Sequence, residues 1–234
     1  MRNSSSAHSP KREASIFNLL LELPLFQGLS SVDLNEIVAH AHFDFTKTSE
    51  QTTLIREGES CSDIVFLLHG TVMAERGASN GSYRVREFLH APAVIGPEHL
   101  FGLSPYHDTS YTTQTPCSLF TLSKNEVLKI SRQFLVFHLN LLNLLSTRLW
   151  RQQRQLWHQS PASVRELIVR FFQSHCQYPA GEKTFIMRME DLAREIHDSR
   201  LDVSRELNAM QEEGLVSLSR RHIHIPSLQK LTMK

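Results

Sequence analysis

Residues 191–214 read DLAREIHDSRLDVSRELNAMQEEG, and this stretch decides the fold of the C-terminal part of the chain. Its apolar residues recur at helical spacing on two short faces, which carry Leu192, Ala193 and Ile196, then Val203, Leu207 and Met210. The spacing breaks at residues 197–199. Ser199 can cap the second face, because its hydroxyl can accept from the free N–H groups of a first helical turn. The stretch therefore predicts two short helices joined by a tight turn.

The second predicted helix turns a polar face away from its apolar seam. That face carries Arg200, Asp202, Ser204, Arg205 and Asn208. Side chains of these types can hydrogen-bond base edges and phosphates when a helix lies in the major groove of DNA. A solvated face on an ordinary surface helix has the same composition. The interpretation as a DNA-reading helix therefore needs support from the residues that follow.

The residues after Gly214 predict a small basic hairpin. Residues 215–218 and 223–225 read as two short strands, and Ser219-Arg220-Arg221-His222 between them is a basic turn. A helix-turn-helix followed by such a hairpin is typical of a winged helix.

The run D-L-A-x-x-I-x-x-S-R-x-x-V-S-R-x-L-x-x-M-x-x-x-G-L-V, then R-R-x-I-x-I, resembles the DNA-binding domain of the CRP/FNR superfamily of bacterial transcription regulators. In the turn, one residue departs from the family pattern, which usually has glycine where this chain has His197. Histidine is among the non-glycine residues that tolerate a positive φ. We therefore expect the turn to form at a small local cost.

Between residues 42 and 122 the apolar period changes to two, in short runs separated by turn residues. This pattern predicts a β-sandwich or barrel. The pieces I-R-E-G-E-x-x-x-x-I-V-F-L-L-H-G-T-V, at residues 55–72, resemble the cyclic-nucleotide-binding β-roll of the same superfamily. The string L-P-L-F-Q-G-L-S, at residues 23–30, resembles its entry helix. Taken without the flanking helices, the strands would fit any β-barrel.

The expected fold class is α+β. A disordered tail at residues 1–14 precedes a β-roll (double-stranded β-helix) sensor domain with flanking helices at 15–130. A long dimerisation helix follows at 131–159, and a winged helix-turn-helix DNA-binding domain at 160–234. Two capping signals mark helix starts: Ser123 with Glu126 as a capping box, and Ser160-Pro161 at the domain boundary.

Leucine recurs every seven residues along the long helix. The predicted seam contains Leu135, Leu142, Leu149 and Leu156, with His138 and Leu145 at the second seam position. Such a seam is typical of a parallel two-stranded coiled coil, so we expect a homodimer. The alternative is that the helix packs only on its own β-roll.

The resemblance also implies an effector pocket in the β-roll. In cyclic-nucleotide binders a glutamate holds the ribose hydroxyl and an Arg-Ser pair holds the phosphate. Here Gly96 and Glu98 are separated by Pro97, and His107 and Asp108 fall where Arg and Ser would be. A carboxylate repels a phosphate, and the bidentate guanidinium is missing. We therefore predict poor binding of cyclic AMP and an effector of other chemistry, in a pocket formed by Gly96, Glu98, His99, His107 and Asp108.

No cofactor is predicted, although haem stays open as an alternative. Some relatives carry haem in this domain, and His99, His107 or His138 could supply an axial imidazole. The chain has 13 histidines, however, and they are scattered. A second alternative is a constitutive regulator whose β-roll is only a scaffold. No metal site is expected, since the three cysteines lie far apart and the cysteine group of iron–sulfur relatives is absent.

Composition is consistent with a globular regulator but does not by itself indicate DNA binding. The 234 residues include 25 Lys and Arg against 24 Asp and Glu, a net charge of +1. Basic residues must therefore be segregated onto one face. No apolar run reaches the roughly 18–20 residues of a membrane span, and the polar N-terminus has no signal-peptide core. We expect a cytoplasmic protein without a membrane segment, and not an enzyme, because no catalytic motif occurs.

The resemblance assigns roles to individual residues of the reading helix and the wing. Arg200 and Arg205 are the expected base-edge readers. Leu201 replaces the acidic residue that many relatives have at that point of the helix, so we expect a shifted base preference through contact with a thymine methyl. Phosphate contacts are expected from Ser199, Ser204, Arg220 and Arg221. The implied partners are double-stranded DNA with a near-palindromic operator, a second copy of the chain, RNA polymerase and an unidentified small-molecule effector.

Overall fold

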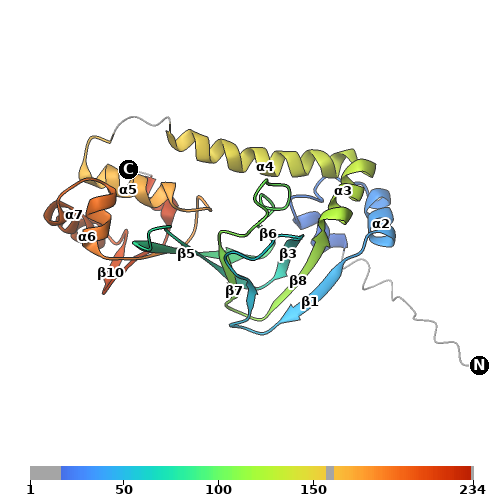
Figure 1. Cartoon of the computed structure of the whole chain (residues 1–234), viewed down its shortest axis with the longest axis horizontal. Helices are drawn as coiled ribbons and strands as arrows, with labels where there is room; N and C mark the ends of the chain where they lie inside the picture. Colours follow the sequence, from blue (N-terminus) through green and yellow to red (C-terminus); the bar gives the residue numbers. More distant parts are fainter. Residues whose placement is uncertain (1–16, 157–160, 233–234) are drawn as a thin grey trace, which may run out of the picture.

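The computed structural model describes residues 17–156 and 161–232, except the side chains of 152, 154–156 and 232. A β-roll lies at one end and a helical unit with a small sheet at the other, and one long helix runs along the top (Figure 1). The predicted α+β class is confirmed. The predicted tail at residues 1–14 lies outside the described residues.

The β-roll is built from two sheets. One has the strand order β1-β8-β3-β6, and the other begins β2-β7-β4-β5. Between the sheets and the helices lies an aromatic cluster in which the rings of Phe66 and Phe120 stack at 4.5 Å. Phe26 of the entry segment and Phe137 of α4 meet at 5.3 Å beside them. The roll strands are β1 (Asp44–Thr48), β2 (Thr53–Ile55), β3 (Asp63–His69), β4 (Thr71–Gly77), β5 (Tyr83–His90), β6 (Ala93–Ile95), β7 (Ser110–Thr113) and β8 (Cys117–Ser123).

Helices flank the roll, as the resemblance implies. They are α2 (Ser31–His40), α3 (Lys124–Gln133) and the long α4 (Leu135–Leu156). Ser123 caps α3 by accepting from the backbone N–H of Glu126. The predicted capping box is incomplete, because the Glu126 carboxylate accepts instead from the backbone N–H of His42.

The C-terminal unit is a winged helix. Its elements are α5 (Val164–Ser174), β9 (Lys183–Met187), α6 (Met189–Glu195), α7 (Arg200–Glu212), β10 (Ser217–Ser219), β11 (His222–Ile225) and the 3₁₀ turn η1 (Leu228–Thr232). The start predicted at Ser160-Pro161 is wrong, since Ser163 caps α5 through the N–H of Glu166. The turn between α6 and α7 forms as predicted, with His197 at φ 56°.

The winged helix and the β-roll share one sheet, which the sequence did not predict. Strand β5 pairs antiparallel with β9, with Arg84 opposite Ile186 and Arg86 opposite Thr184. The second sheet therefore has seven strands in the order β10-β11-β9-β5-β4-β7-β2. Val85 of β5 also belongs to the apolar core of the winged unit.

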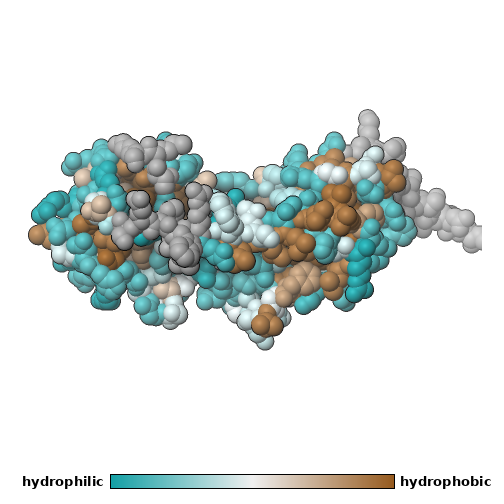
Figure 2. Space-filling view, turned by 90° about the horizontal axis from the view of Figure 1, so that it is seen from above, coloured by the Kyte–Doolittle hydropathy of each residue, from teal (hydrophilic) through white to brown (hydrophobic). Residues whose placement is uncertain are grey.

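Helix α4 packs one side on the roll and exposes the other. Phe137 and Leu141 are buried against the roll core. Of the predicted seam, Leu135, His138, Leu142 and Leu149 are exposed and Leu145 is half-buried, whereas the Leu156 side chain lies outside the described residues. Figure 2, which views the molecule from above, shows apolar side chains gathered on this face.

Candidate nucleic-acid interface and β-roll pocket

Helix α7 presents the predicted reading residues on an open surface. Ser199 caps the helix by accepting from the N–H of Asp202 at 3.1 Å, and its own hydroxyl donates to the Asp202 carboxylate at 2.6 Å. The Ser199 hydroxyl is therefore engaged in the cap. Leu201, 69% exposed, points into solvent on the first turn of the helix.

The two predicted base readers make only exposed ion pairs. Arg205 lies 3.0 Å from Asp202, and Arg200 lies 3.7 Å from Glu190, with both guanidinium groups about two-thirds exposed. Such pairs contribute little to stability in water. Both arginines can therefore exchange these partners for a base edge or phosphate at small cost. Ser204 lies half-buried on the same helix.

The wing and the start of α7 enclose a groove of about 240 Å³. Arg220 and Arg221 form the exposed turn between β10 and β11, and Arg221 adopts φ 63° there. Three arginines of different elements line the groove, namely Arg188, Arg200 and Arg221. Several arginines along one groove can each contact a phosphate oxygen of a nucleic-acid backbone. Arg188 was missed in the sequence because it precedes α6, outside the motif residues.

A buried carboxylate holds this surface in place. Asp191 of α6 accepts from Arg188 at 2.9 Å and lies 3.3 Å from Arg194. The hydrogen bond from Arg188 lowers the pKa of Asp191 despite its burial. Arg165 of α5 binds Glu206, in the middle of α7, and Glu213, the C-cap residue of α7, at 2.5 Å each. These two ion pairs hold α5 against α7. These two pairs raise the pKa of the Arg165 guanidinium.

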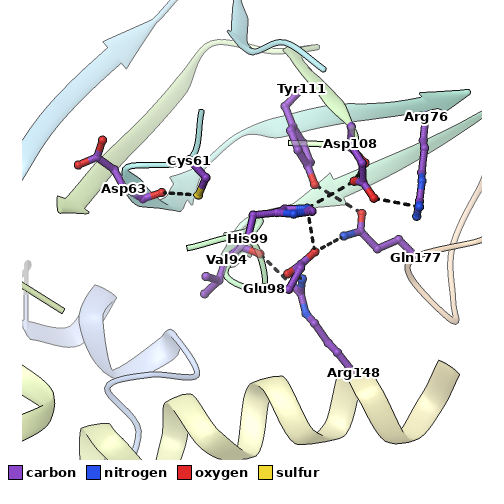
Figure 3. Close-up of polar contacts among 11 residues, drawn as sticks. Cys61, Asp63, Arg76, Val94, Glu98, His99, Asp108, Tyr111, Arg148 and Gln177 are labelled. Atoms are coloured by element: carbon purple, nitrogen blue, oxygen red, sulfur yellow. Dashed lines mark hydrogen bonds and ion pairs between the residues drawn. The ribbon is translucent and has the colours of Figure 1, made fainter. Parts of the chain in front are cut away.

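The five predicted pocket residues lie together in the β-roll. The carboxylates of Glu98 and Asp108 are already paired with cations from other elements (Figure 3). The Glu98 carboxylate binds Arg148 of α4 and accepts from the Gln177 side chain at 2.8 Å. Asp108 lies 2.9 Å from Arg76 and 3.4 Å from His99. The cations Arg76 and Arg148 were missed because they lie outside the local run at residues 96–108.

His107 fills the space beside the glycine of the pocket. It is 6% exposed, and its Nδ1 has no hydrogen-bond partner among the described residues. Burial, followed by the nearby His99, lowers the pKa of the His107 imidazole. Gly96 adopts φ 59°, and a Cβ there would lie 3.1 Å from the His107 ring. Glycine is therefore required at 96 by both its conformation and the close histidine.

Of the three histidines considered for haem, His99 and His107 lie side by side, and His138 lies apart on α4. The His99 ring faces Asp108 and packs edge-on against His107, with ring centroids 5.4 Å apart. His138 is exposed on α4. Within residues 17–156 and 161–232, no group of three or more His, Cys, Asp or Glu side chains could hold a metal ion.

Two family models match the chain, one in its N-terminal part and one in its C-terminal part. The model for the cyclic nucleotide-binding domain matches residues 46–134, and that for the Crp-like helix-turn-helix domain matches residues 165–233. The chain belongs to the CRP/FNR superfamily of transcription regulators.

Individual CRP/FNR proteins are similar at low identity. The cAMP-activated global transcriptional regulator Vfr of Pseudomonas aeruginosa is 23% identical over 192 residues, covering 78% of this chain and 88% of Vfr. The sensor domain of the regulator DNR from the same organism is 24% identical with a TM-score of 0.52, covering 65% of this chain and 99% of that one. The catabolite activator protein of Thermus thermophilus is 20% identical with a TM-score of 0.48, covering 89% and 96%.

As a CRP/FNR regulator, the chain carries two separate candidate sites. Helix α7 and the wing make an exposed cationic surface, and the residues of the predicted roll pocket make a partly exposed cluster of paired charges. Among the described residues, no helix is long and apolar enough to cross a membrane.

Proposed function

We propose that the chain is a homodimeric, sequence-specific DNA-binding regulator that recognises a near-palindromic operator in the cytoplasm. The observation that carries the proposal is the shared exposure of Arg200 and Arg205 on α7, next to the groove that Arg188 and Arg221 line. Arginine is the side chain best suited to bidentate contact with guanine, and the wing cations suit phosphates. Contact with RNA polymerase is part of the same proposal and rests on family membership.

Dimerisation supplies the symmetry that a palindrome requires. The exposed apolar stripe on α4 includes Leu135, Leu142 and Leu149 at heptad spacing, and Leu139 and Trp150 widen it. A second copy of α4 would cover it in a parallel pair. Two reading helices related by the resulting two-fold axis would enter successive major grooves about one helical turn apart.

The test is selection of binding sites from random duplex DNA by the full-length chain. We expect a near-palindrome with half-site centres about 10–10.5 base pairs apart. The variant with Arg200→Ala and Arg205→Ala should enrich no sequence, whereas the surface variant Lys47→Ala on the roll should enrich the same one. Equal enrichment by the wild type and the double variant would contradict the proposal.

The effector is proposed to be a molecule other than cyclic AMP. Glu98 and Asp108 bring two carboxylates to the pocket, and the nearby Arg148 and Arg76 are each engaged with one of them. A nucleotide phosphate would therefore meet repulsion before it gained a cation. Titration calorimetry of the dimer should give no measurable heat of cyclic AMP binding, and a micromolar or tighter constant would contradict this.

A constitutive regulator is the second candidate, and one observation favours it. The charged groups of the pocket pair with one another within the chain, so no occupant is needed to neutralise them. Gentle purification followed by native mass spectrometry and an absorption spectrum distinguishes the candidates. A bound small-molecule mass supports an effector, a Soret band supports the haem alternative, and operator binding of full strength by a demonstrably ligand-free dimer supports the scaffold.

A further inference from the structure

Gln177 joins the winged unit to the β-roll at the pocket. It lies in the loop between α5 and β9, and its side-chain amide donates to Oε1 of Glu98 at 2.8 Å. The hydroxyl of Tyr111 on β7 donates to the side-chain oxygen Oε1 of Gln177 at 3.4 Å, and the Gln177 backbone N–H donates to Glu87 of β5 at 2.8 Å. One loop residue of the winged unit therefore contacts three segments of the roll. Figure 3 shows its contacts with Glu98 and Tyr111.

The Glu98 carboxylate binds both the winged unit and the long helix α4. Its Oε1 accepts from Gln177 of the winged unit, and its Oε2 accepts from Arg148 of the long helix α4. Arg148 also donates to the backbone carbonyl of Val94 at 3.3 Å, so the arginine is held from two directions. Each carboxylate oxygen thus has a partner from a different structural unit.

The winged unit and the roll also meet at a second place, the start of β5, through one aromatic contact and one hydrogen bond. Tyr83 at the start of β5 packs edge-on against Phe171 of α5, with ring centroids 5.3 Å apart. The Ser82 hydroxyl donates to Glu195 of α6 at 3.2 Å. The apolar contact is non-directional, whereas hydrogen bonds to a charged group have a defined geometry. The carboxylate contacts are therefore the part of the docking that a ligand can alter selectively.

We propose that Glu98 is a positioning residue that links occupancy of the roll pocket to docking of the winged unit on β5. A molecule that donates a hydrogen bond to Glu98 competes with Gln177 for Oε1 or with Arg148 for Oε2. It must present hydrogen-bond donors or positive charge to do so. Such a ligand shifts the docking equilibrium because it binds the undocked arrangement better. The ligand-dependent part rests on the proposed effector control, and the positioning part does not.

The test is hydrogen–deuterium exchange of the full-length chain, with peptides covering β5 and β9 as the readout. Gln177→Glu sets a second carboxylate against Glu98, and Glu98→Ala removes the acceptor without adding a charge. We expect both variants to speed exchange in residues 83–90 and 183–187 by roughly tenfold or more, as loss of a hydrogen bond to a charged group implies. Peptides of β3 and α7 should exchange as in the wild type, which also shows that the variants fold.

Asn125→Asp is the matched control, since it makes the same amide-to-acid change on the exposed surface of α3 and should leave all peptides unchanged. Unchanged exchange of β5 and β9 in both variants would overturn the proposal. So would an equal increase in every peptide, because Glu98 would then serve only global stability. Operator binding is measured separately, so a failure of the proposed DNA binding would leave the exchange result standing.

Discussion

Lys183 of β9 and Glu87 of β5 form an ion pair at 2.9 Å, with side-chain exposures of 0% and 7%. The same carboxylate accepts from the backbone N–H groups of Gln177 and Tyr178 at 2.8 and 3.0 Å. Among the described residues the Lys183 ammonium makes no hydrogen bond of normal geometry, so its contact with Glu87 is that of an ion pair. Burying two charges costs solvation free energy, which is offset only when both are paired. This pair therefore makes the docking of β9 on β5 specific.

Lys183→Met should destabilise the folded chain strongly. It leaves the Glu87 charge buried with two N–H donors but no cation, and losing one partner of a buried pair costs about 3–5 kcal/mol. The free energy of unfolding in urea measures the effect. Lys47→Met, on the exposed face of β1, is the control and should stay within about 0.5 kcal/mol of the wild type. Similar values for the two variants would refute the assigned role of the pair.

Arg205→Ala should weaken binding to the selected operator by about 1–3 kcal/mol and relax the preference for one base pair. The reason is the loss of a bidentate contact from an exposed guanidinium whose present partner, Asp202, is a weak surface one. Fluorescence anisotropy with operator duplexes that vary at each position measures both effects. Arg132→Ala removes an exposed arginine from α3 instead and should change neither. Operator affinity untouched by Arg205→Ala would rule out the assumed docking of α7.

Leu149→Glu should convert the dimer to a monomer at micromolar concentration. Leu149 is 56% exposed on α4, so its substitution leaves the fold of one protomer intact but sets two carboxylates across the seam. Light scattering and native mass spectrometry measure the assembly. Leu103→Glu changes an even more exposed leucine in the loop after β6 and should remain dimeric. A wild-type chain that is already monomeric would disprove the proposed dimer.

Stability should fall as the pH drops below about 6.5, and His107 should account for part of the loss. Burial, then His99, lowers its pKa, although Glu98, Asp108 and Glu59 act in the opposite direction. The unfolded imidazole, with a pKa of about 6.5, therefore binds a proton before the folded one does. The stabilisation is complete above that pH and is lost between the unfolded and the lower folded pKa.

Unfolding free energies at about pH 7.5 and about pH 5.5 test this assignment. His107→Leu should show a smaller difference between the two conditions than the wild type, because its side chain does not titrate. His69→Leu, at an exposed position at the end of β3, should keep the wild-type difference. If His107→Leu kept the full difference, other groups would be responsible.

Local patterns were sufficient to predict the two helices and the turn at the centre of the C-terminal unit. The spacing of Leu192, Val203 and Leu207 identified both helix faces, and all three side chains are buried. The Ser199 cap and the positive φ of His197 also formed as expected, since each depends on neighbouring backbone. The predicted cap at Ser160 was wrong because Ser163, three residues later, has the same hydroxyl and accepts from the backbone N–H of Glu166.

The pocket was predicted in part. Glu98, His99, His107 and Asp108 meet because one short stretch carries all four. Their cationic partners come from β4 and α4, and nothing in the local pattern linked Arg76 or Arg148 to them. The sequence therefore identified the acidic groups of the pocket but not the groups that neutralise them.

By itself, the sequence determined the roll, the long helix with its heptad leucines and the winged helix, because periodicity, caps and turn residues act over a few neighbours. Only the tertiary structure decided that β5 and β9 join into one sheet and that Glu98 is shared by Gln177 and Arg148. Strand edges pair through backbone groups that nearly all residues carry alike, so pairing across about a hundred residues leaves no periodic signal. Ion pairs between distant segments likewise depend on where the packed units bring each side chain.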